Sequence, residues 1–335
     1  MSLKLKIIIL FLTSVKQVSF AWGFYGHKLI NRQAVYSLPS GPLFSFFKAN
    51  IEYLTEQSVN PDKRRYTQEE EACRHYIDME AYEDSTKKVL PIYFQDAKKK
   101  YSEDTLKKHG ILPWQIYKVQ SMLTKAMAEK NASKILFLAA DLGHYIGDAH
   151  VPLHTTKNYD GQLTNQKGIH AFWESRLPEL YATSYDLLVG KAAYLQDVQK
   201  AAWQAVYASH HAVDSVLQLE AQLSAQIPEN EKYAFEERNA VTVRVYSSAF
   251  SLSYHNALQG QVERRLAYAI KMVADVWYTS WVEAGQPDLS QMPLEQSPEN
   301  PKEEQPQQKI KNERFLESHR NCAGHETLHL TLKSN

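Results

Sequence analysis

The feature that most restricts the fold of this 335-residue chain is a group of histidines and carboxylates spaced for helices. His144 and Asp148 are four residues apart, so on a helix both side chains lie on one face. A proline two residues before His154 ends that helix, and a short bend can return this third side chain to the same place. His170 and Glu174 repeat the four-residue spacing. Imidazole and carboxylate are the ligands that zinc takes where thiolates are absent, so this segment predicts a zinc site built on helices.

A single pair at this spacing is weak evidence, because helix surfaces carry such pairs as solvated or ion-paired faces. His210 and Asp214 repeat the spacing without a third ligand nearby, and we expect no metal there. His150 falls off the ligand face by helical spacing, so we expect it at the surface or behind the ligands. Asp141 lies one turn before His144, where it either orients an imidazole or is solvated.

Most of the chain has helical apolar spacing, and we expect little strand. The ranges 119–130 and 132–145 place apolar residues three and four apart. The range 187–224 has few helix breakers, and 233–285 is helical with one interruption near 256–260. The sequence therefore predicts an all-α fold of many helices in one domain.

The two ends of the chain differ from this helical body. Residues 1–21 have the order of a signal peptide: two lysines, an apolar run and a small-x-small cleavage site that ends at Ala21. The run is too short for a stable membrane anchor. We predict cleavage there, export to the periplasm or the extracellular space, and a mature chain without an integral membrane segment. Residues 290–335 are polar and rich in Pro, Glu and Gln, which predicts a disordered tail after a domain at 22–289.

The net charge and the cysteine content exclude few classes of partner or fold. The chain has 38 basic and 38 acidic residues, so its net charge gives no argument for nucleic acid or an anionic membrane as a required partner. A local patch or a metal cluster can still supply positive charge. Cys73 and Cys322 can form one disulfide at most, which is no framework.

The stretch from His144 to Asn158 resembles the signature of the bacterial zinc-dependent phospholipase C family. The start of the predicted mature chain, from Trp22 to His27, is similar instead to the zinc-dependent single-strand nucleases of fungi and plants. Both groups belong to one superfamily of mostly helical phosphodiesterases that carry three zinc ions. The resemblance implies a single helical domain with a trinuclear zinc site, and a phosphodiester as the substrate.

The resemblance also implies which residues hold the three zinc ions. The first ion would take Asp62, His75, His144 and Asp148. The second ion would take His154, His170 and Glu174. The third would take His27, Asp148 as a bridge, and the α-amine and carbonyl of Trp22, which cleavage after Ala21 would free. Asp62 is then the expected proton acceptor for the attacking water, and Asp148 fixes the spacing of the metals.

The substrate stays open at this stage. Glu174 stands where the nucleases typically have aspartate, and the complete signature with Asn158 favours the phospholipase branch. The glycine–asparagine segment typical of the nucleases is absent from residues 162–168. The compact Trp22–His27 spacing and the Phe172–Trp173 pair favour the nuclease branch. We expect a monomeric hydrolase that resembles phospholipase C, with a single-strand nuclease as the alternative.

A zinc cluster that is purely structural is a further alternative. Structural zinc sites are closed by four protein ligands and favour cysteine. The ligands implied here are histidines and carboxylates, and the second ion has only three side chains, which leaves an open position. An open position favours catalysis.

Overall fold

Helices dominate the protein, which we describe from a computed structural model of residues 23–82, 90–238, 241–290 and 292. The first half contains eight α-helices: α1 (Gly23–Ser37), α2 (Pro42–Ala49), α3 (Ile51–Glu56), α4 (Asn60–Arg64), α5 (Phe94–Tyr101), α6 (Glu103–Lys108), α7 (Leu112–Ala128) and α8 (Ala132–Ala149). The second half contains α9 (Ile169–Ala171), α10 (Leu177–Tyr181), α11 (Val198–His210), α12 (Val213–Gln226), α13 (Glu229–Lys232), α14 (Ser248–Ala257) and α15 (Gln261–Glu283). The all-α prediction is confirmed for this part of the chain, apart from one hairpin.

Short helical turns join several of these helices. They are η1 (Gln57–Val59), η2 (Ala72–Arg74), η3 (Met79–Ala81), η4 (Pro152–Thr155), η5 (Phe172–Arg176) and η6 (Ala182–Ser184). Of these, η5 is a π-helical turn, which is wider than an α-helical turn and is frequent at functional sites. Among the described helices, none combines the length and the apolar character needed to cross a bilayer.

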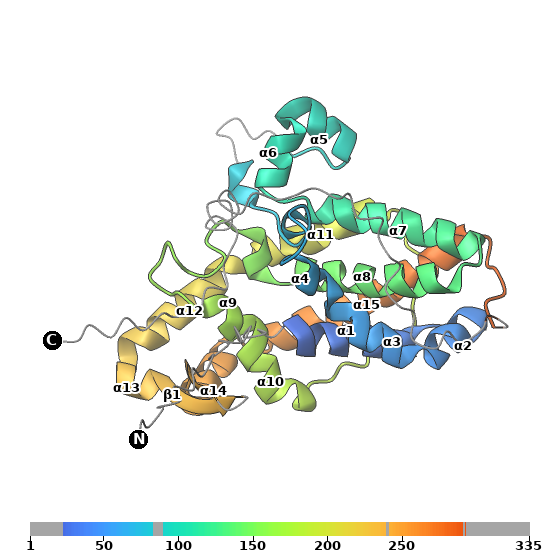
Figure 1. Cartoon of the computed structure of the whole chain (residues 1–335). Helices are drawn as coiled ribbons and strands as arrows, with labels where there is room; N and C mark the ends of the chain where they lie inside the picture. The colour runs from blue at the N-terminus through green and yellow to red at the C-terminus, as the bar shows by residue number, and fades with distance from the viewer. Residues whose placement is uncertain (1–22, 83–89, 239–240, 291, 293–335) are drawn as a thin grey trace, which may run out of the picture.

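Helix α8 lies at the centre of the domain. It packs against α1, α3, α7, α11 and α15. Three of these helices, α1, α7 and α15, run lengthwise beside it in Figure 1. Every residue from Leu138 to Ala149 is buried. The helix begins where the Asn131 side chain accepts a hydrogen bond from the Lys134 backbone N–H at 3.0 Å. The C-terminal part of α8 therefore delivers its side chains to the interior.

Two glycines of α8 let α1 approach it closely. A Cβ atom at Gly143 would overlap the Asn31 side-chain amide, and one at Gly147 would come 2.8 Å from His27 Nδ1. The Asn31 amide uses this space to donate to the carbonyls of Leu54 at 3.0 Å and Ala140 at 3.1 Å. The glycines thus fix the position of α1, and of the histidine near its start, against α8.

Residues 233–246 were expected to be helical, and that prediction is wrong. They form an antiparallel hairpin of β1 (Tyr233–Arg238) and β2 (Val241–Tyr246). The second strand reads Val-Thr-Val-Arg-Val-Tyr: it is rich in β-branched residues, and its valines alternate with the period of a strand. One face of the hairpin carries Glu236, which pairs with Arg176 of η5, while Phe235 on the other face is 75% exposed.

The helical prediction also fails at residues 187–197, which run as an extended strap. Their backbone donors bond to other elements and not to one another. Ala192 N–H donates to the Ser37 carbonyl at 2.7 Å, and Ala193 N–H donates to Asp275 Oδ1 at 2.7 Å. In this strap, hydrogen bonds to acceptors that are distant in sequence replace the backbone hydrogen bonds that a helix would form internally.

The helix break expected near 256–260 is confirmed, because α14 ends at Ala257 and α15 begins at Gln261. The predicted signal peptide, Trp22 and Cys322 lie outside the described residues. So does all of the predicted 290–335 tail except Ser290 and Met292. The boundaries at 22 and 289 therefore stay predictions. Leu289 itself is fully buried against the core.

A buried arginine ties three helices together behind the end of α8. Arg265 of α15 donates from Nε to the His150 carbonyl at 2.8 Å and from Nη2 to the Ala205 carbonyl at 3.1 Å. Its Nη2 also contacts Ser209 Oγ of α11. Burial lowers the pKa of this guanidinium to about 10, so it remains charged at neutral pH.

We expect Arg265→Ala to lower the free energy of unfolding by roughly 2–4 kcal/mol, because two buried carbonyls lose their donors. Chemical denaturation followed by circular dichroism measures this change. The control is Arg264→Ala, which removes an exposed arginine one position earlier and should cost less than about 0.5 kcal/mol. Equal effects of the two variants would show that the buried bonds contribute little.

Candidate metal centre

The histidine and aspartate pair predicted on α8 lies at the buried centre of the site. His144 Nε2 is 3.3 Å from Asp148 Oδ2, and neither side chain is more than 2% exposed. His75, which follows η2, places its Nδ1 3.0 Å from both of those atoms. Asp62 of α4 adds Oδ1 at 3.7 Å from His75 Nδ1 and 3.8 Å from His144 Nε2. Four predicted ligands from three separate segments therefore meet at one point.

The spacing of these atoms fits one zinc ion. Ligands at about 2.0–2.2 Å from a tetrahedral zinc lie about 3.3–3.6 Å from one another. Five of the six pairs among the four side chains are separated by 3.0 to 3.8 Å. Asp62 is the least buried member, since its side chain is 23% exposed.

A second group joins η4 with the α9–η5 segment. Glu174 Oε2 lies 2.7 Å from His170 Nε2 and 3.5 Å from His154 Nε2. All three side chains are buried, and their ligand atoms lie within 4.8 Å of one another. The predicted three-residue set is therefore assembled as one cluster.

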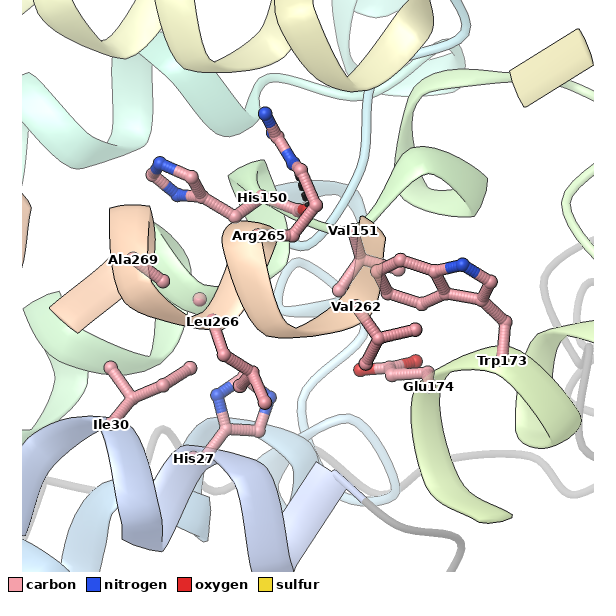
Figure 2. A pocket seen from close by; sticks show the side chains of 11 residues that line it. His27, Ile30, His150, Val151, Trp173, Glu174, Val262, Arg265, Leu266 and Ala269 are labelled. Carbon is pink, nitrogen blue, oxygen red and sulfur yellow. Dashed lines mark hydrogen bonds between the residues drawn. The ribbon is translucent and has the colours of Figure 1, made fainter. Parts of the chain in front are cut away.

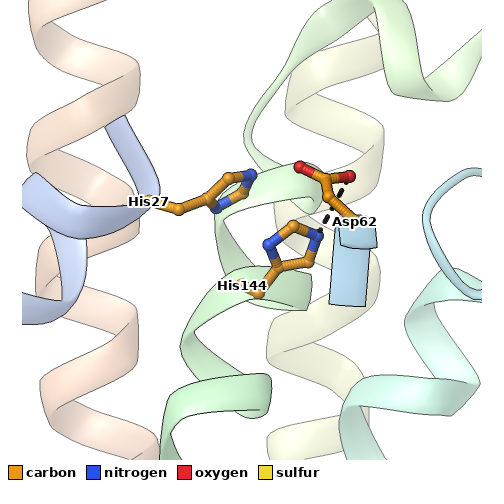
Figure 3. A group of neighbouring side chains, drawn as sticks. All are labelled: His27, Asp62 and His144. Atoms are coloured by element: carbon orange, nitrogen blue, oxygen red, sulfur yellow. Dashed lines mark ion pairs between the residues drawn. The ribbon is translucent and has the colours of Figure 1, made fainter. Parts of the chain in front are cut away.

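A third group forms where α1 meets α8. His27 Nε2 is 3.3 Å from Asp148 Oδ1, and its ring stacks on the His144 ring with centroids 3.8 Å apart. His27, Asp62 and His144 also lie close enough to share an ion (Figure 3). The two oxygens of Asp148 face different groups, as a bridging carboxylate requires. The third predicted contributor, Trp22, lies outside the described residues.

Backbone carbonyls set the orientation of two imidazoles. Ser58 O lies 2.9 Å from His144 Nδ1, and His75 O lies 2.5 Å from His154 Nδ1. A carbonyl can only accept, so each Nδ1 carries the proton. Each Nε2 is therefore the nitrogen that faces the carboxylates, and it is the one that would bind a metal ion.

The charge of the cluster also fits a cation. Burial opposes ionisation of Asp148, but the neighbouring His144 and His154 outweigh it and hold the pKa of this carboxyl well below its usual range. Burial lowers the pKa of each of these histidines, yet the carboxylates raise both pKa values to about 9. His27 Nδ1 is buried without a hydrogen-bond partner among the described residues. Buried carboxylates here demand positive charge, which a dication supplies in place of protons.

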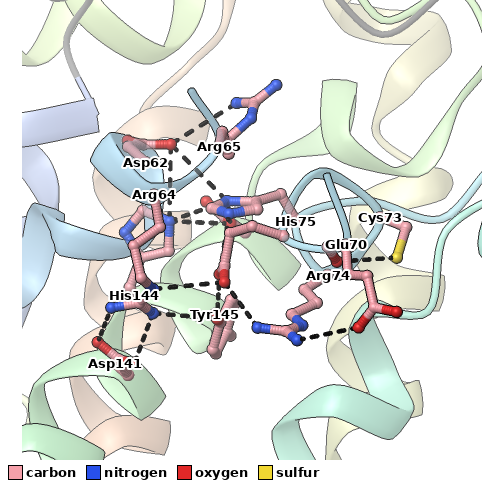
Figure 4. A network of polar contacts seen from close by, with 12 residues as sticks. Asp62, Arg64, Arg65, Glu70, Cys73, Arg74, His75, Asp141, His144 and Tyr145 are labelled. Atoms are coloured by element: carbon pink, nitrogen blue, oxygen red, sulfur yellow. Dashed lines mark hydrogen bonds and ion pairs between the residues drawn. The ribbon is translucent and has the colours of Figure 1, made fainter. Parts of the chain in front are cut away.

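A polar network that was not predicted from the sequence lies behind His75 (Figure 4). The fully buried Glu71 lies 3.6 Å from His75 Nε2 and accepts from Tyr145 Oη. It also pairs with Arg74 at 2.6 Å and with Arg64 at 3.3 Å. The charges of the network hold the pKa of the Glu71 carboxyl far below its usual range against the effect of burial. Glu71 precedes His75 by four residues, the same spacing that identified the ligands, and this signal was available.

Asp141 is not solvated, which corrects one of the two expectations for it. Its carboxylate is buried and forms an ion pair with Arg64, with Nη2 to Oδ2 at 2.6 Å. Burial raises the pKa of this carboxyl to about 6 although the arginine opposes the shift. Arg64 also pairs with Glu71, which contacts His75. Asp141 therefore acts on His75 indirectly, through Arg64 and Glu71.

His150 is 6% exposed, which corrects the expectation of a surface histidine. Its Nδ1 bonds to the Ile146 carbonyl at 2.8 Å, and burial with the nearby Arg265 lowers its pKa to about 3. His210 bonds to the Thr155 carbonyl at 3.0 Å, and Asp214 is exposed. Neither residue of that pair belongs to a metal group among the described residues.

A small pocket of about 20 Å³ lies on the α15 side of the centre (Figure 2). His27 and Glu174 reach it from the metal groups, and Ile30, Val262 and Leu266 give it an apolar wall. The space holds about one water molecule.

The Nuclease S1 of Aspergillus oryzae is 24% identical over 192 residues, which cover 53% of this chain and 62% of that protein. The chain thus spans less than two thirds of the length of this relative. Two solved structures overlap 80% of the chain at 15% identity: alpha-toxin of an avian strain of Clostridium perfringens, with a TM-score of 0.46 over 66% of its length, and alpha toxin of Clostridium absonum, with a TM-score of 0.45 over 65%.

The S1/P1 nuclease family model matches residues 22–275, which is more than half of the chain and includes every predicted ligand. The expected superfamily is confirmed by this match. The chain therefore belongs to the S1/P1 nuclease family, a family of zinc-dependent phosphodiesterases.

Proposed function

We propose that this protein hydrolyses phosphodiester bonds of single-stranded nucleic acid with three zinc ions. The match of the nuclease family model across residues 22–275 carries the proposal. It reverses the ranking drawn from the sequence motifs, which favoured a phospholipase. The ligand sets proposed for the three ions are those implied by the resemblance, and the three convergent groups support them.

The three groups of histidines and carboxylates would hold zinc ions, which would supply a more acidic water molecule and positive charge to offset that of the phosphodiester. Asp62 then accepts the proton of the attacking water, because it is the ligand most open to solvent. Burial acts to raise its pKa, but the charges of His144 and His75 outweigh this and keep the Asp62 carboxylate ionised. Asp148 holds two metal groups at a fixed separation through its two oxygens.

Basic side chains flank Asp62 at the open side of the centre. Arg65 Nη1 lies 3.6 Å from Asp62 Oδ1, and Lys63 is exposed with its Nζ 5.7 Å from the centre of the Phe24 ring. A cation beside an aromatic ring suits a nucleotide, because the cation can pair with the phosphate and the ring can stack on the base.

Hydrolysis of a phospholipid headgroup is the second candidate, because Glu174 is the carboxylate that the phospholipases have at this position. Asn158, the other motif that favoured this branch, has a structural role. Its Nδ2 donates to Thr164 Oγ1 at 3.1 Å, and its Oδ1 accepts from Leu163 N–H at 2.8 Å. It thus closes its own loop, and its presence gives no argument about the substrate.

Mature protein should hold three zinc ions, and Asp148→Asn should retain about one, because this carboxylate serves two groups. Elemental analysis after dialysis measures the content. The matched control is Asp214→Asn, which alters an exposed aspartate and should leave all three ions in place. Full zinc content in the Asp148 variant would contradict the trinuclear assignment.

Zinc affinity should rise with pH up to about 9. His144 and His154 have pKa values near 9 in the metal-free fold, against an ordinary value of 6.5. Their protonation therefore stabilises the metal-free protein below pH 6.5, and this contribution is lost as the pH rises through 9. Zinc must displace both protons at pH 7. Calorimetry in two buffers with different ionisation enthalpies should report release of about two protons, and buffer-independent heats would contradict the assignment.

Zinc-loaded mature protein should release nucleotides from single-stranded DNA faster than it releases phosphorylated headgroup from phosphatidylcholine vesicles. Because basic side chains neutralise phosphates, the binding of DNA should weaken steeply with salt. Headgroup release with inert DNA would establish the phospholipase alternative and leave the metal assignment intact. Inertness toward both, with zinc bound, would point to a cluster that does not cleave these substrates.

A further inference from the structure

The β1–β2 hairpin contacts both ends of η5, the turn that carries Glu174. Arg176, the last residue of η5, donates from Nη1 to Glu236 Oε2 of β1 at 2.9 Å and from Nη2 to Glu236 Oε1. At the first residue of the turn, the Phe172 ring stacks on the Tyr246 ring of β2 with centroids 3.7 Å apart. Each strand of the hairpin therefore holds one end of η5.

Helical spacing puts these contacts on the side of η5 that faces away from the metal ligands. His170 and Glu174 are four residues apart, and both side chains approach His154. Phe172 and Arg176 are also four residues apart, and each lies two positions from Glu174. Residues two positions apart point roughly 200° apart on an α-helix. The hairpin therefore holds the turn from the side opposite the ligands.

The wide form of η5 needs support from outside the turn. Leu177 N–H donates to the Phe172 carbonyl five residues back, as in a π-helix. Pro178 has no N–H, so it cannot donate to the Glu174 carbonyl as an α-helix would require. π-helical turns are rare and occur mostly singly within α-helices. The direction of the Glu174 side chain therefore depends on contacts that other segments make with η5.

The ion pair between η5 and β1 is a strong contact of this kind. Arg176 is 8% exposed, and a guanidinium cannot lose its charge in a protein. A buried cation is stable only with a partner of opposite charge. The hydrogen bond from Arg176 lowers the pKa of the Glu236 carboxyl, so both groups are charged at neutral pH. The bidentate geometry fixes the orientation of Arg176 as well as its position.

A second anchor ties the hairpin to the loop before His170. Lys232, the residue before β1, places its Nζ 2.7 Å from Oε1 of the fully buried Glu220. Oε2 of Glu220 accepts from Gln166 Nε2 at 2.5 Å, four residues before His170. The hairpin is therefore connected to the chain on both sides of His170.

We propose that Arg176 and Glu236 are positioning residues for the second metal group, which joins η4 with the α9–η5 segment. Their ion pair holds η5 so that His170 and Glu174 face His154 in the arrangement that a zinc ion needs. The proposal rests on the proposed function, since the arrangement matters to the reaction only if zinc binds there. The hairpin, which supplies no ligand itself, then sets the affinity of one metal position.

Removal of zinc by rising concentrations of a chelator tests this role. Glu236→Gln keeps the size of the side chain and removes its charge. One ion of three should leave at about tenfold lower chelator concentration than in the wild-type protein, as for other groups that orient metal ligands, and two should be unaffected. Arg176→Lys, which loses the bidentate bond, should weaken the same ion. Elemental analysis of the full-length mature proteins counts the ions that remain.

The matched control is Glu237→Gln, which alters the next residue of β1. Glu237 is exposed and lies on the other face of the hairpin, so this variant should retain zinc like the wild-type protein. The double variant of Arg176→Lys and Glu236→Gln should be little worse than the worse single variant, because the two residues act as one unit. Fully multiplied effects would show that the two residues act separately, and would overturn the proposal.

A pair that only stabilises the fold gives a different result. Circular dichroism shows whether each variant is folded, and if Glu236→Gln is not, Arg176→Lys decides by the same criterion. Equal weakening of all three ions would show a general loss of stability and would overturn the positioning role. Unchanged zinc retention in the folded variants would overturn it too. Absence of zinc from the wild-type protein would instead overturn the proposed function.

Discussion

Burial of the Asp148 carboxylate at the end of α8 is the constraint on which the site depends. An ionised carboxylate away from water is stable only among positive charges and hydrogen-bond donors. His144 and His75 surround one of its oxygens, and His27 and His154 face the other. The segments that carry these histidines must therefore converge on one point, and the packing of the domain follows from that requirement.

The close approach of α1 makes this convergence possible. Gly143 and Gly147 lie four residues apart on α8, so the same face is free of side chains over one turn. Asn31 fills the first gap with an amide that bonds to two other segments, and His27 fills the second. A larger residue at either glycine would displace α1 and withdraw a ligand atom from Asp148.

The sequence could predict the ligand clusters because local spacing determined them. His144 with Asp148 and His170 with Glu174 lie at helical intervals, so each pair needs only its own helix. Asp62 and His27 came from the resemblance, since no spacing connects them to α8. Their place depends on how separate segments pack, which is a tertiary property.

The failures have the same physical origin. The strap at 187–197 has helical composition, but its backbone donors find partners on α1 and α15, and these partners are distant in sequence. The β1–β2 hairpin was overlooked although Val241–Tyr246 alternates like a strand, because aromatic and apolar residues also suit a helix. Asp141 was misjudged because its partner, Arg64, lies 77 positions away.

Substrate choice depends on the walls of the site, because the ligand geometry serves any phosphodiester. Residues 162–168 stand where the nucleases typically have a glycine–asparagine segment, and several polar groups of the loop at 158–168 are bonded within the protein. Asp160 Oδ1 accepts from Gly168 N–H at 3.0 Å, and Gln166 Nε2 bonds to Glu220 of α12 at 2.5 Å. The first of these bonds anchors the loop just before His170. In the proposed nuclease, stacking of a base would fall to Phe24, which lies beside Lys63 next to the proposed proton acceptor. Stacking on such a ring tolerates any base, so a nuclease built this way would bind single strands without strong sequence preference.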